Sequence, residues 1–455
     1  MNIYINLEID TRELDSKILL AVLAADRGHQ VIVSDLSGIE RGFRTKFLSP
    51  GIFHTKSLTP GKRKIEYHQK IIDKGSLITS IDEEGGLVNH GYENFAKRRY
   101  SNHSIGMSSA IFGWGEEDVE TLKKIYPKHS SKIHLTGSPR ADFWKKKFSK
   151  FWSLPPSEAP KRPYLLIIGN MGEVNADTPY YKRFINLKNR GYFQRDQEML
   201  RTFFIRGSEK FLLIHEYIEA IKYMNKHNKN FDIVFRPHPK EDIESWKNYL
   251  DDISNVYVTK EGQLGAWINN SFAVMQNGDT AAYEATISQK QLITFVPFER
   301  QTDNLPNQCG YIVKTKEDLL NKINELLHNS NNQKDLSDQL PSEVSKKIYL
   351  DKNELSAEKI INLWEKLENK NLSKRSNIKM FILFLKIVEI RDKIGFFLKN
   401  IFPKRFERFR FNTKFYPLDK DDIQNRIDKL CDILKIEKKL ELKLISKRTI
   451  LIRKN

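Results

Sequence analysis

A histidine between two prolines is the first feature of the sequence that could do chemistry. Residues 234–242 read VFRPHPKED and place His238 directly after an apolar run typical of a buried strand. Proline cannot donate to a sheet, and the residue before each proline is extended, so the strand must end here and hold the imidazole rigidly. Such a histidine can contact a phosphate as a cation or as a neutral donor, and Arg236 adds a planar guanidinium suited to phosphate. A solvated histidine in a rigid loop is the alternative.

A second candidate anion site is the stretch QNGDTAAYEAT, which follows the apolar strand FAVM. Gly278 permits a tight turn before a helix, whose free N–H groups and positive dipole end attract an anion. Glu284, one turn into that helix, can reach a sugar hydroxyl of a nucleotide. A plain helix cap by Asp279 or Thr280 is the alternative. The donor-side set is therefore Arg236, His238, Asn277, Gly278, Asp279, Thr280 and Glu284.

Acidic and basic side chains also follow strands in the first half of the chain. The loop IDEEGG places Asp82, Glu83 and Glu84 before two glycines, and one desolvated carboxylate there can act as a general base. We predict Glu84 for that role, with Glu83 next. An acidic surface turn is the alternative. On the acceptor side, Arg140 in GSPRADF and the pair Arg12 and Glu13 are weaker candidates.

The elements that must position these residues form two successive α/β series. Short β-rich runs alternate with helical patterns, which predicts βαβ units and parallel sheets. The proline-rich stretch 152–163 separates the series, giving Rossmann-like domains at 1–151 and 164–330, a helical crossing segment at 331–370 and a basic extension at 371–455. A polar, aromatic insertion from Met171 to Glu198 is too long for an ordinary connection. Two such sheets place ligands at the carboxyl ends of their strands, in a cleft between them.

Charge and cysteine content narrow the classes of protein. Of the formal charge of +18 over 455 residues, +13 belongs to the residues from Asn371 onward, which hold 23 Lys and Arg against 10 Asp and Glu. The basicity is thus confined to one end, and no nucleic-acid-binding motif accompanies it. Cys309 and Cys431 form neither a disulfide framework nor a zinc pattern, which favours a reducing compartment. We expect no signal peptide and no spanning helix.

The order of several motifs resembles the bacterial surface carbohydrate biosynthesis protein family. An early REL and RGHQV are followed by DEEGG, FGWG, TGSPRADF, RPHP and GDTAAYEA, over roughly residues 1–330. The resemblance implies a GT-B fold, in which two Rossmann-like domains face each other across a cleft, here with a mostly helical basic C-terminal extension. The acidic-acidic-Gly and His-Pro motifs are also distantly similar to those of bacterial sialyltransferases and capsule Kdo transferases.

Those families imply roles for individual residues. Glu84 or Glu83 would assist the acceptor hydroxyl, His238 would contact the donor's phosphate, and Thr280 would match, more loosely, a Ser/Thr near that phosphate. DEEGG offers three carboxylates, so the base stays open among Asp82, Glu83 and Glu84. The retaining or inverting outcome stays open as well.

The basic extension contains a stretch, residues 377–415, that mixes apolar and cationic side chains at helical spacing. This pattern is typical of a helix lying on anionic lipid, worth about 1 kcal/mol per cationic side chain near the surface. A helix packed on the body with its cations turned outward is the alternative. The last twenty residues fit a helix or a hairpin equally well.

These observations predict a cytoplasmic glycosyltransferase, peripheral on the inner face of the cell membrane. It would use a nucleotide-sugar as substrate, CMP-linked Kdo or sialic acid by resemblance, and a surface polysaccharide or lipid-linked glycan as acceptor. We expect no permanently bound cofactor, no metal and no nucleic-acid partner. The alternatives are a teichoic-acid-type CDP-polyol phosphotransferase, a nucleotide-sugar epimerase, a nucleic-acid-binding protein and a non-catalytic scaffold of glycan assembly.

Overall fold

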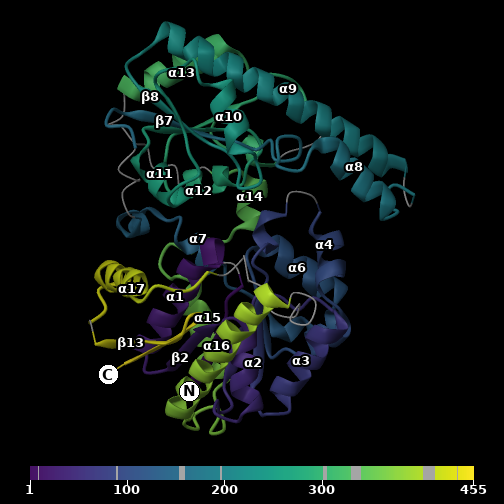
Figure 1. Ribbon diagram of the computed structural model, residues 1–455, viewed down its shortest axis with the longest axis vertical. Helices are drawn as coiled ribbons and strands as arrows, with labels where there is room; N and C mark the ends of the chain where they lie inside the picture. The colour runs from purple at the N-terminus through teal and green to yellow at the C-terminus, as the bar shows by residue number, and fades with distance from the viewer. Residues whose placement is uncertain are drawn as a thin grey trace. The chain divides into compact units, whose positions relative to one another are not determined.

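The computed structural model describes residues 1–8, 10–88, 91–152, 159–194, 197–300, 305–328, 340–402, 416–437 and 439–454. The chain divides into two compact units: unit 1 is Met1–Phe143 with Ser345–Asn455, and unit 2 is Trp144–Val344. Unit 1 therefore contains both ends of the chain, drawn purple and yellow in Figure 1. Part of the proline-rich stretch that we expected to separate the domains, residues 153–158, lies outside the described residues.

Unit 1 is built on a sheet of eight described strands in the order β13-β14-β2-β1-β3-β4-β5-β6. Strands β1 to β6 are parallel neighbours, as the alternating pattern predicts. All five residues of β1 are buried, because helices cover both faces of the sheet. The strands are β1 (Asn2–Asn6), β2 (Gln30–Ser34), β3 (Ile52–Thr55), β4 (Leu77–Ile81), β5 (Ala110–Gly113), β6 (Ile133–Leu135), β13 (Leu440–Ser446) and β14 (Thr449–Lys454).

Helices α1 to α7 of unit 1 follow its parallel strands, whereas α15, α16 and α17 come after unit 2 in the chain. Helix α7 is short: it stops at Asp142, and Phe143, Trp144 and Phe148 are buried in the turns that follow. The helices are α1 (Asp10–Asp26), α2 (Leu36–Arg44), α3 (Lys62–Ile72), α4 (Tyr92–Arg99), α5 (Asn102–Gly106), α6 (Glu116–Ile125), α7 (Pro139–Asp142), α15 (Ser356–Lys366), α16 (Ile378–Ile401) and α17 (Lys420–Leu434).

Unit 2 has a parallel sheet of six described strands in the order β12-β11-β10-β7-β8-β9. Its strands are β7 (Tyr164–Ile168), β8 (Asp232–Arg236), β9 (Val256–Val258), β10 (Ala273–Gln276), β11 (Leu292–Phe295) and β12 (Tyr311–Val313). Its helices are α8 (Tyr180–Asn189), α9 (Gln197–His227), α10 (Ile243–Tyr249), α11 (Leu264–Asn270), α12 (Ala281–Ile287) and α13 (Lys316–His328), and α14 (Ser342–Lys347) spans the boundary with unit 1. The long insertion thus contains α8, and the 31-residue α9 begins at its end (Figure 1).

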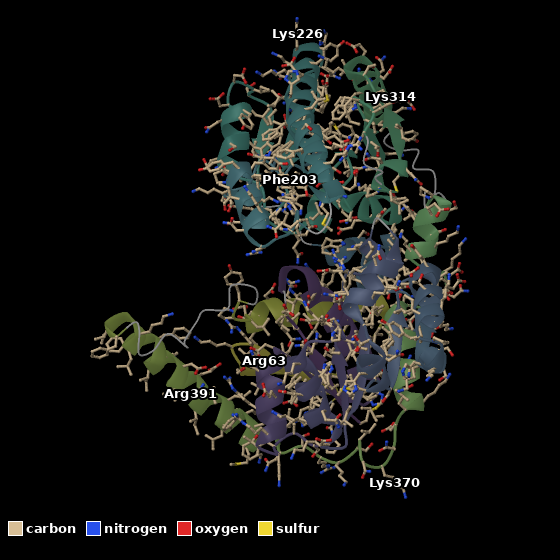
Figure 2. All side chains as sticks on the ribbon, turned by 90° about the vertical axis from the view of Figure 1, so that its right-hand side faces the viewer. Arg63, Phe203, Lys226, Lys314, Lys370 and Arg391 are labelled. Atoms are coloured by element: carbon tan, nitrogen blue, oxygen red, sulfur yellow. The ribbon has the colours of Figure 1, made fainter. Side chains whose placement is uncertain are left out.

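The C-terminal extension belongs to unit 1. Its final residues form a hairpin, and β14 pairs antiparallel with β2, which resolves the open choice between helix and hairpin. Helix α17 is held to α1 by an ion pair between Arg426 and Asp15. Figure 2 shows α16, with Arg391 labelled, running out from the rest of unit 1. In the described part of the chain, no helix is both long and apolar enough to cross a bilayer.

The predicted fold class is confirmed. The parallel strands β1 to β6 of unit 1 and the parallel sheet of unit 2, each with helices on its faces, form two Rossmann-like domains, and the extension is mostly helical with an antiparallel hairpin.

Candidate functional site

His238 lies two residues beyond the end of β8, and two hydrogen bonds fix its loop. Its backbone N–H donates to Glu241 Oε1 at 3.0 Å, while its ring Nδ1 accepts from the Lys240 N–H at 3.1 Å. Because Nδ1 accepts, the neutral ring carries its hydrogen on Nε2. Burial lowers the pKa of His238, which favours that neutral form near pH 7. The geometry presents Nε2–H as a hydrogen-bond donor.

Glu241 anchors this loop and was not predicted from the sequence. Its Oε1 also accepts from the Met171 N–H at 3.0 Å, and its Oε2 accepts from Trp246 Nε1 at 2.6 Å. The carboxylate is buried, which raises its pKa despite these donors. Glu241 therefore connects the loop after β8 to the loop after β7. No pattern in the sequence predicts this role.

The predicted turn at the end of β10 is present. Gly278 has a φ of +70°, which favours glycine, and its N–H donates to Asn307 Oδ1 at 2.6 Å. Asn170, after β7, donates to the Gly278 carbonyl at 2.6 Å. Asp279 Oδ1 accepts from the Ala281 N–H at 2.8 Å, so this carboxylate itself caps α12. One of the free N–H groups at the start of α12 is therefore already bonded to Asp279, as expected if Asp279 is a plain helix cap.

His238 and Asp279 lie close enough for their charges to interact. Burial raises the pKa of Asp279, and the His238 imidazole opposes that shift. Lys210, from the middle of α9, acts on both groups and is itself buried. Burial, with Arg300 nearby, lowers the pKa of Lys210 to about 8. Contacts of the segment after β7 connect the two loops: Asn170 donates to the Gly278 carbonyl, and the next N–H, of Met171, donates to Glu241 of the His238 loop. The RPHP and GDT motifs therefore lie beside the same segment of unit 2, and the buried Lys210 interacts electrostatically with both.

Arg300 extends this cluster from the segment after β11. Its Nη1 donates to Asn277 Oδ1 at 2.6 Å, and its Nε pairs with Glu209 of α9 at 3.4 Å. Asn277 is buried and also donates to the Phe295 carbonyl at 2.6 Å. Because Arg300 follows the end of a strand, its position in the sequence could have identified it as a candidate site residue. Lys210 and Glu209 had none, since the interior of a long helix gives no hint of which turn meets a site.

Two predicted donor-side residues have other surroundings. Arg236 donates to the carbonyls of Lys260, Glu261 and Gly262, and its guanidinium lies 5.8 Å from the Trp267 ring centroid. Burial lowers the pKa of Arg236 to about 10. This side chain holds the loop after β9, so its donors are already engaged. Thr280 occupies the N-cap position of α12 without a capping hydrogen bond, and Glu284 is half-buried in the first turn.

The three carboxylates of the acidic loop in unit 1 differ in their burial and in their ion pairs. Asp82 makes a two-pronged ion pair with Arg99 at 2.7 and 2.9 Å. Glu83 is buried and paired with Lys17 of α1, which is also buried. Glu84 is exposed. Of the three, only Glu84 therefore presents its carboxylate to solvent.

The acceptor-side candidates lie on two elements of unit 1. Glu13 is buried in α1, where it pairs with Lys56 at 3.4 Å and accepts from the Glu8 N–H at 3.0 Å. Arg12 belongs to α1, but its side chain is outside the described residues. Arg140 is half-buried in α7. The structure describes Glu13 as an ion-paired core residue rather than a surface contact.

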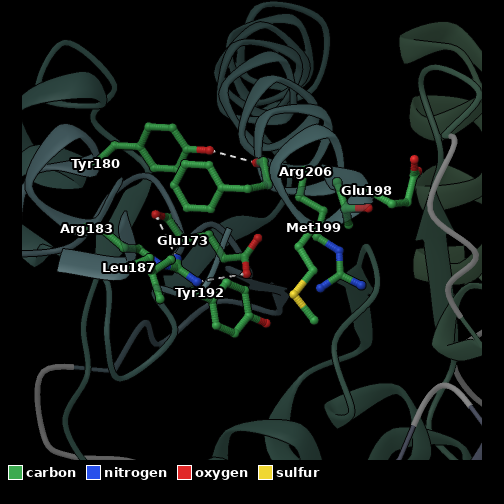
Figure 3. Close-up of a pocket in the computed structure, with 10 residues that line it drawn as sticks. Glu173, Tyr180, Arg183, Leu187, Tyr192, Glu198, Met199 and Arg206 are labelled. Atoms are coloured by element: carbon green, nitrogen blue, oxygen red, sulfur yellow. Dashed lines mark hydrogen bonds and ion pairs between the residues drawn. The ribbon is translucent and has the colours of Figure 1, made fainter. Parts of the chain in front are cut away.

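A pocket of about 400 Å³ lies in the insertion of unit 2 (Figure 3). Arg183 pairs there with Glu173 at 3.3 Å, while Arg206 has no hydrogen-bond or ion-pair partner among the residues that the structure describes. Glu173 follows Gly172, where an added Cβ would lie 3.4 Å from His238 Nδ1, so the pocket begins beside the His238 loop. The lining residues are Glu173, Tyr180, Arg183, Leu187, Tyr192, Glu198, Met199, Thr202, Phe203 and Arg206.

The chemistry of unit 2 suits a phosphorylated, sugar-bearing ligand. A neutral imidazole donor and a buried ammonium are groups that bind phosphate oxygens. Aromatic rings beside a guanidinium provide apolar contact and a partner for an anion. Within the described ranges, no three His, Cys, Asp or Glu side chains gather as they would around a metal ion.

Comparison with known proteins supports the fold at a distance. Neither a family model nor a curated protein matches the sequence. A Listeria monocytogenes protein provisionally assigned as a UDP-N-acetylglucosamine 2-epimerase is 12% identical, with a TM-score of 0.51 over 82% of this chain and 98% of that one. The UDP-GlcNAc 2-epimerase of Methanocaldococcus jannaschii is also similar, with 12% identity and a TM-score of 0.49 over 80% of this chain and 100% of that one. A glycosyltransferase of Rickettsia africae has 12% identity and a TM-score of 0.45 over 81% of this chain and 99% of that one. The first of these likenesses shows that the chain has a GT-B-like fold.

Proposed function

We propose that this protein is a glycosyltransferase that moves a sugar from a nucleotide-activated donor to a glycan. By the resemblance of its motifs to surface carbohydrate biosynthesis proteins, the donor is a CMP-linked sugar acid of the Kdo or sialic acid type. The acceptor is a surface polysaccharide or a lipid-linked glycan, reached at the inner face of the cell membrane.

The observation that carries this proposal is the cluster around Lys210 in unit 2. When the bond between the sugar and the donor phosphate breaks, negative charge grows on the phosphate oxygens. The Nε2–H of His238 and the ammonium of Lys210 can stabilise that charge with little reorganisation, since a hydrogen bond orients the His238 ring and burial restricts the Lys210 side chain. Glu84 takes the proton of the acceptor hydroxyl, the hydroxyl oxygen bonds to the anomeric carbon, and the nucleotide leaves.

The pocket between α8 and α9 supports an acidic sugar. It begins beside the His238 loop, so a sugar attached to a phosphate bound there can enter it. Tyr192, with 47% of its surface exposed, offers a ring face, and the guanidinium of Arg206 matches a sugar carboxylate. A neutral sugar would leave that cation without a partner.

A thermal-shift screen with CMP, CDP, UDP and GDP tests the proposal. A ligand that binds only the folded state raises its stability by mass action. We expect CMP to raise the melting temperature most. A selective response to UDP would change the donor class, and one to CDP would favour the polyol phosphotransferase. No response to any nucleotide would contradict the proposal and favour a non-catalytic scaffold.

Nucleotide affinity is expected to fall as the pH rises through about 8. Lys210 is cationic below its pKa of about 8 and neutral above it, and a bound phosphate favours the cation. Calorimetric titration of CMP across this range should therefore show weaker binding at the alkaline end. Lys210→Arg keeps its charge and should remove this dependence, while Lys222→Arg, a half-exposed lysine on the same helix, should retain it. An unchanged pH profile in Lys210→Arg would exclude Lys210 from the site.

A further inference from the structure

Helix α16 carries a continuous apolar stripe on its outer face. The stripe residues recur at alternating intervals of four and three, so they form one line along the helix. Each is between 52 and 65% exposed, although each is a large hydrophobic side chain. We call this line the α16 stripe; it consists of Leu383, Ile387, Ile390, Ile394, Phe397 and Ile401.

The opposite face of α16 fixes the direction of the stripe. Phe381, Leu385 and Val388 are buried, and the first two belong to the core of unit 1. The ring of Phe384 also packs against Phe47, with centroids 6.0 Å apart. The helix is thus anchored through one face, which turns the α16 stripe away from the body of unit 1. Figure 2 shows the helix leaving that body on its way past Arg391.

The charges beside the α16 stripe indicate whether a second copy of the chain or a phospholipid surface covers it. Lys379, Lys386 and Lys393 recur every seven residues along one border. If a second copy packed on the stripe, these border lysines would face the border cations of its partner, without acidic residues to pair with them. A surface of phosphate groups would satisfy all three lysines while apolar chains cover the stripe.

The two acidic residues of α16 lie off the stripe. Glu389 accepts from the Lys447 N–H at 2.6 Å, so it faces the hairpin of unit 1. Asp392 pairs with Arg391. Neither places an uncompensated negative charge beside the stripe, which leaves the lysine border available to an anionic partner.

We propose that α16 docks unit 1 on an anionic phospholipid bilayer, with the α16 stripe at the boundary between headgroups and acyl chains. Lys379, Lys386 and Lys393 contact the headgroup phosphates. The docking depends on the two faces of α16 and does not require that the protein be a transferase, so either proposal can fail without the other.

Vesicle sedimentation of the full chain tests the docking. We expect the protein to sediment with vesicles of mixed phosphatidylglycerol and phosphatidylcholine, to stay in solution with phosphatidylcholine alone, and to be released by salt. Ile387→Glu combined with Ile394→Glu should lower the bound fraction about tenfold, because it places charge in the apolar layer. Lys386→Gln with Lys393→Gln should weaken binding to the anionic vesicles.

A matched control uses an exposed isoleucine elsewhere. Ile312 on β12 is 55% exposed, and Ile312→Glu should leave vesicle binding unchanged. Thermal unfolding of each variant confirms that the fold is intact. Binding that survives the double glutamate change, or equal binding to neutral vesicles, would overturn the proposal. So would a dimer in light scattering that the same change dissociates while vesicles are not bound, since a second copy would then cover the stripe.

Discussion

Replacing His238 with alanine is expected to lower the rate of sugar transfer by roughly 10²–10³-fold, the usual cost of removing one preorganised donor from a developing anion. The substitution removes the hydrogen bond from the Lys240 N–H to the ring, but the loop should survive, because the His238 backbone N–H still donates to Glu241 and Trp246 still holds that carboxylate. Transfer from the donor identified by nucleotide screening, followed as release of free nucleotide, measures the effect.

The matched control for this variant is His227→Ala. His227 is an exposed histidine at the end of α9, where its ring bonds to the Tyr223 carbonyl at 2.9 Å. Removing it takes away an imidazole without touching the cluster around Lys210, so transfer should be unchanged. Activity like that of the unaltered protein in His238→Ala would remove this residue from the mechanism.

Glu84→Gln is expected to abolish transfer while leaving nucleotide binding intact. The substitution keeps the size of the side chain but removes its ability to accept a proton, and general bases contribute about 10²–10⁴-fold. Since Glu84 is exposed, the fold should not suffer. Measuring transfer and the thermal shift with nucleotide on the same sample separates the two effects.

The neighbouring carboxylate provides the contrast. Glu83→Gln leaves the buried Lys17 without its counter-ion, which typically costs about 3–5 kcal/mol of unfolding free energy. Chemical denaturation should therefore detect Glu83→Gln and not Glu84→Gln. If Glu84→Gln stays active and Glu83→Gln is folded but inactive, the base is Glu83.

The elements of the fold were predictable because their signals are local. Short β-rich runs that alternate with helical patterns predicted the parallel strands, and the proline and glycine after two of these runs predicted the His238 and Gly278 loops. The rule that ligands gather at strand carboxyl ends also predicts that these two loops share a site, which stays a prediction. The hairpin at the C-terminus could not be distinguished from a helix, because apolar and cationic residues that alternate over so few positions fit the period of a strand as well as that of a helix.

The partners within the site were less predictable, because they depend on tertiary packing. Lys210 becomes a site residue only because one turn of α9 is buried near Asp279. Glu241 acts through hydrogen bonds to two segments far from it in the chain. Conversely, Arg236 has the right residue type and position, yet three backbone carbonyls engage its guanidinium. Residue type at a strand end shows what chemistry is possible, and packing decides which side chains are available for it.

The pairing of β14 with β2 has a consequence for the order in which this protein matures on the ribosome. Strand β2 is translated early, but its antiparallel neighbour arrives only after all of unit 2 has been made. Until then, the edge of β2 is an unsatisfied row of amides and carbonyls on the nascent chain. Unit 2 can thus complete its fold first, and the domain begun earliest is finished last.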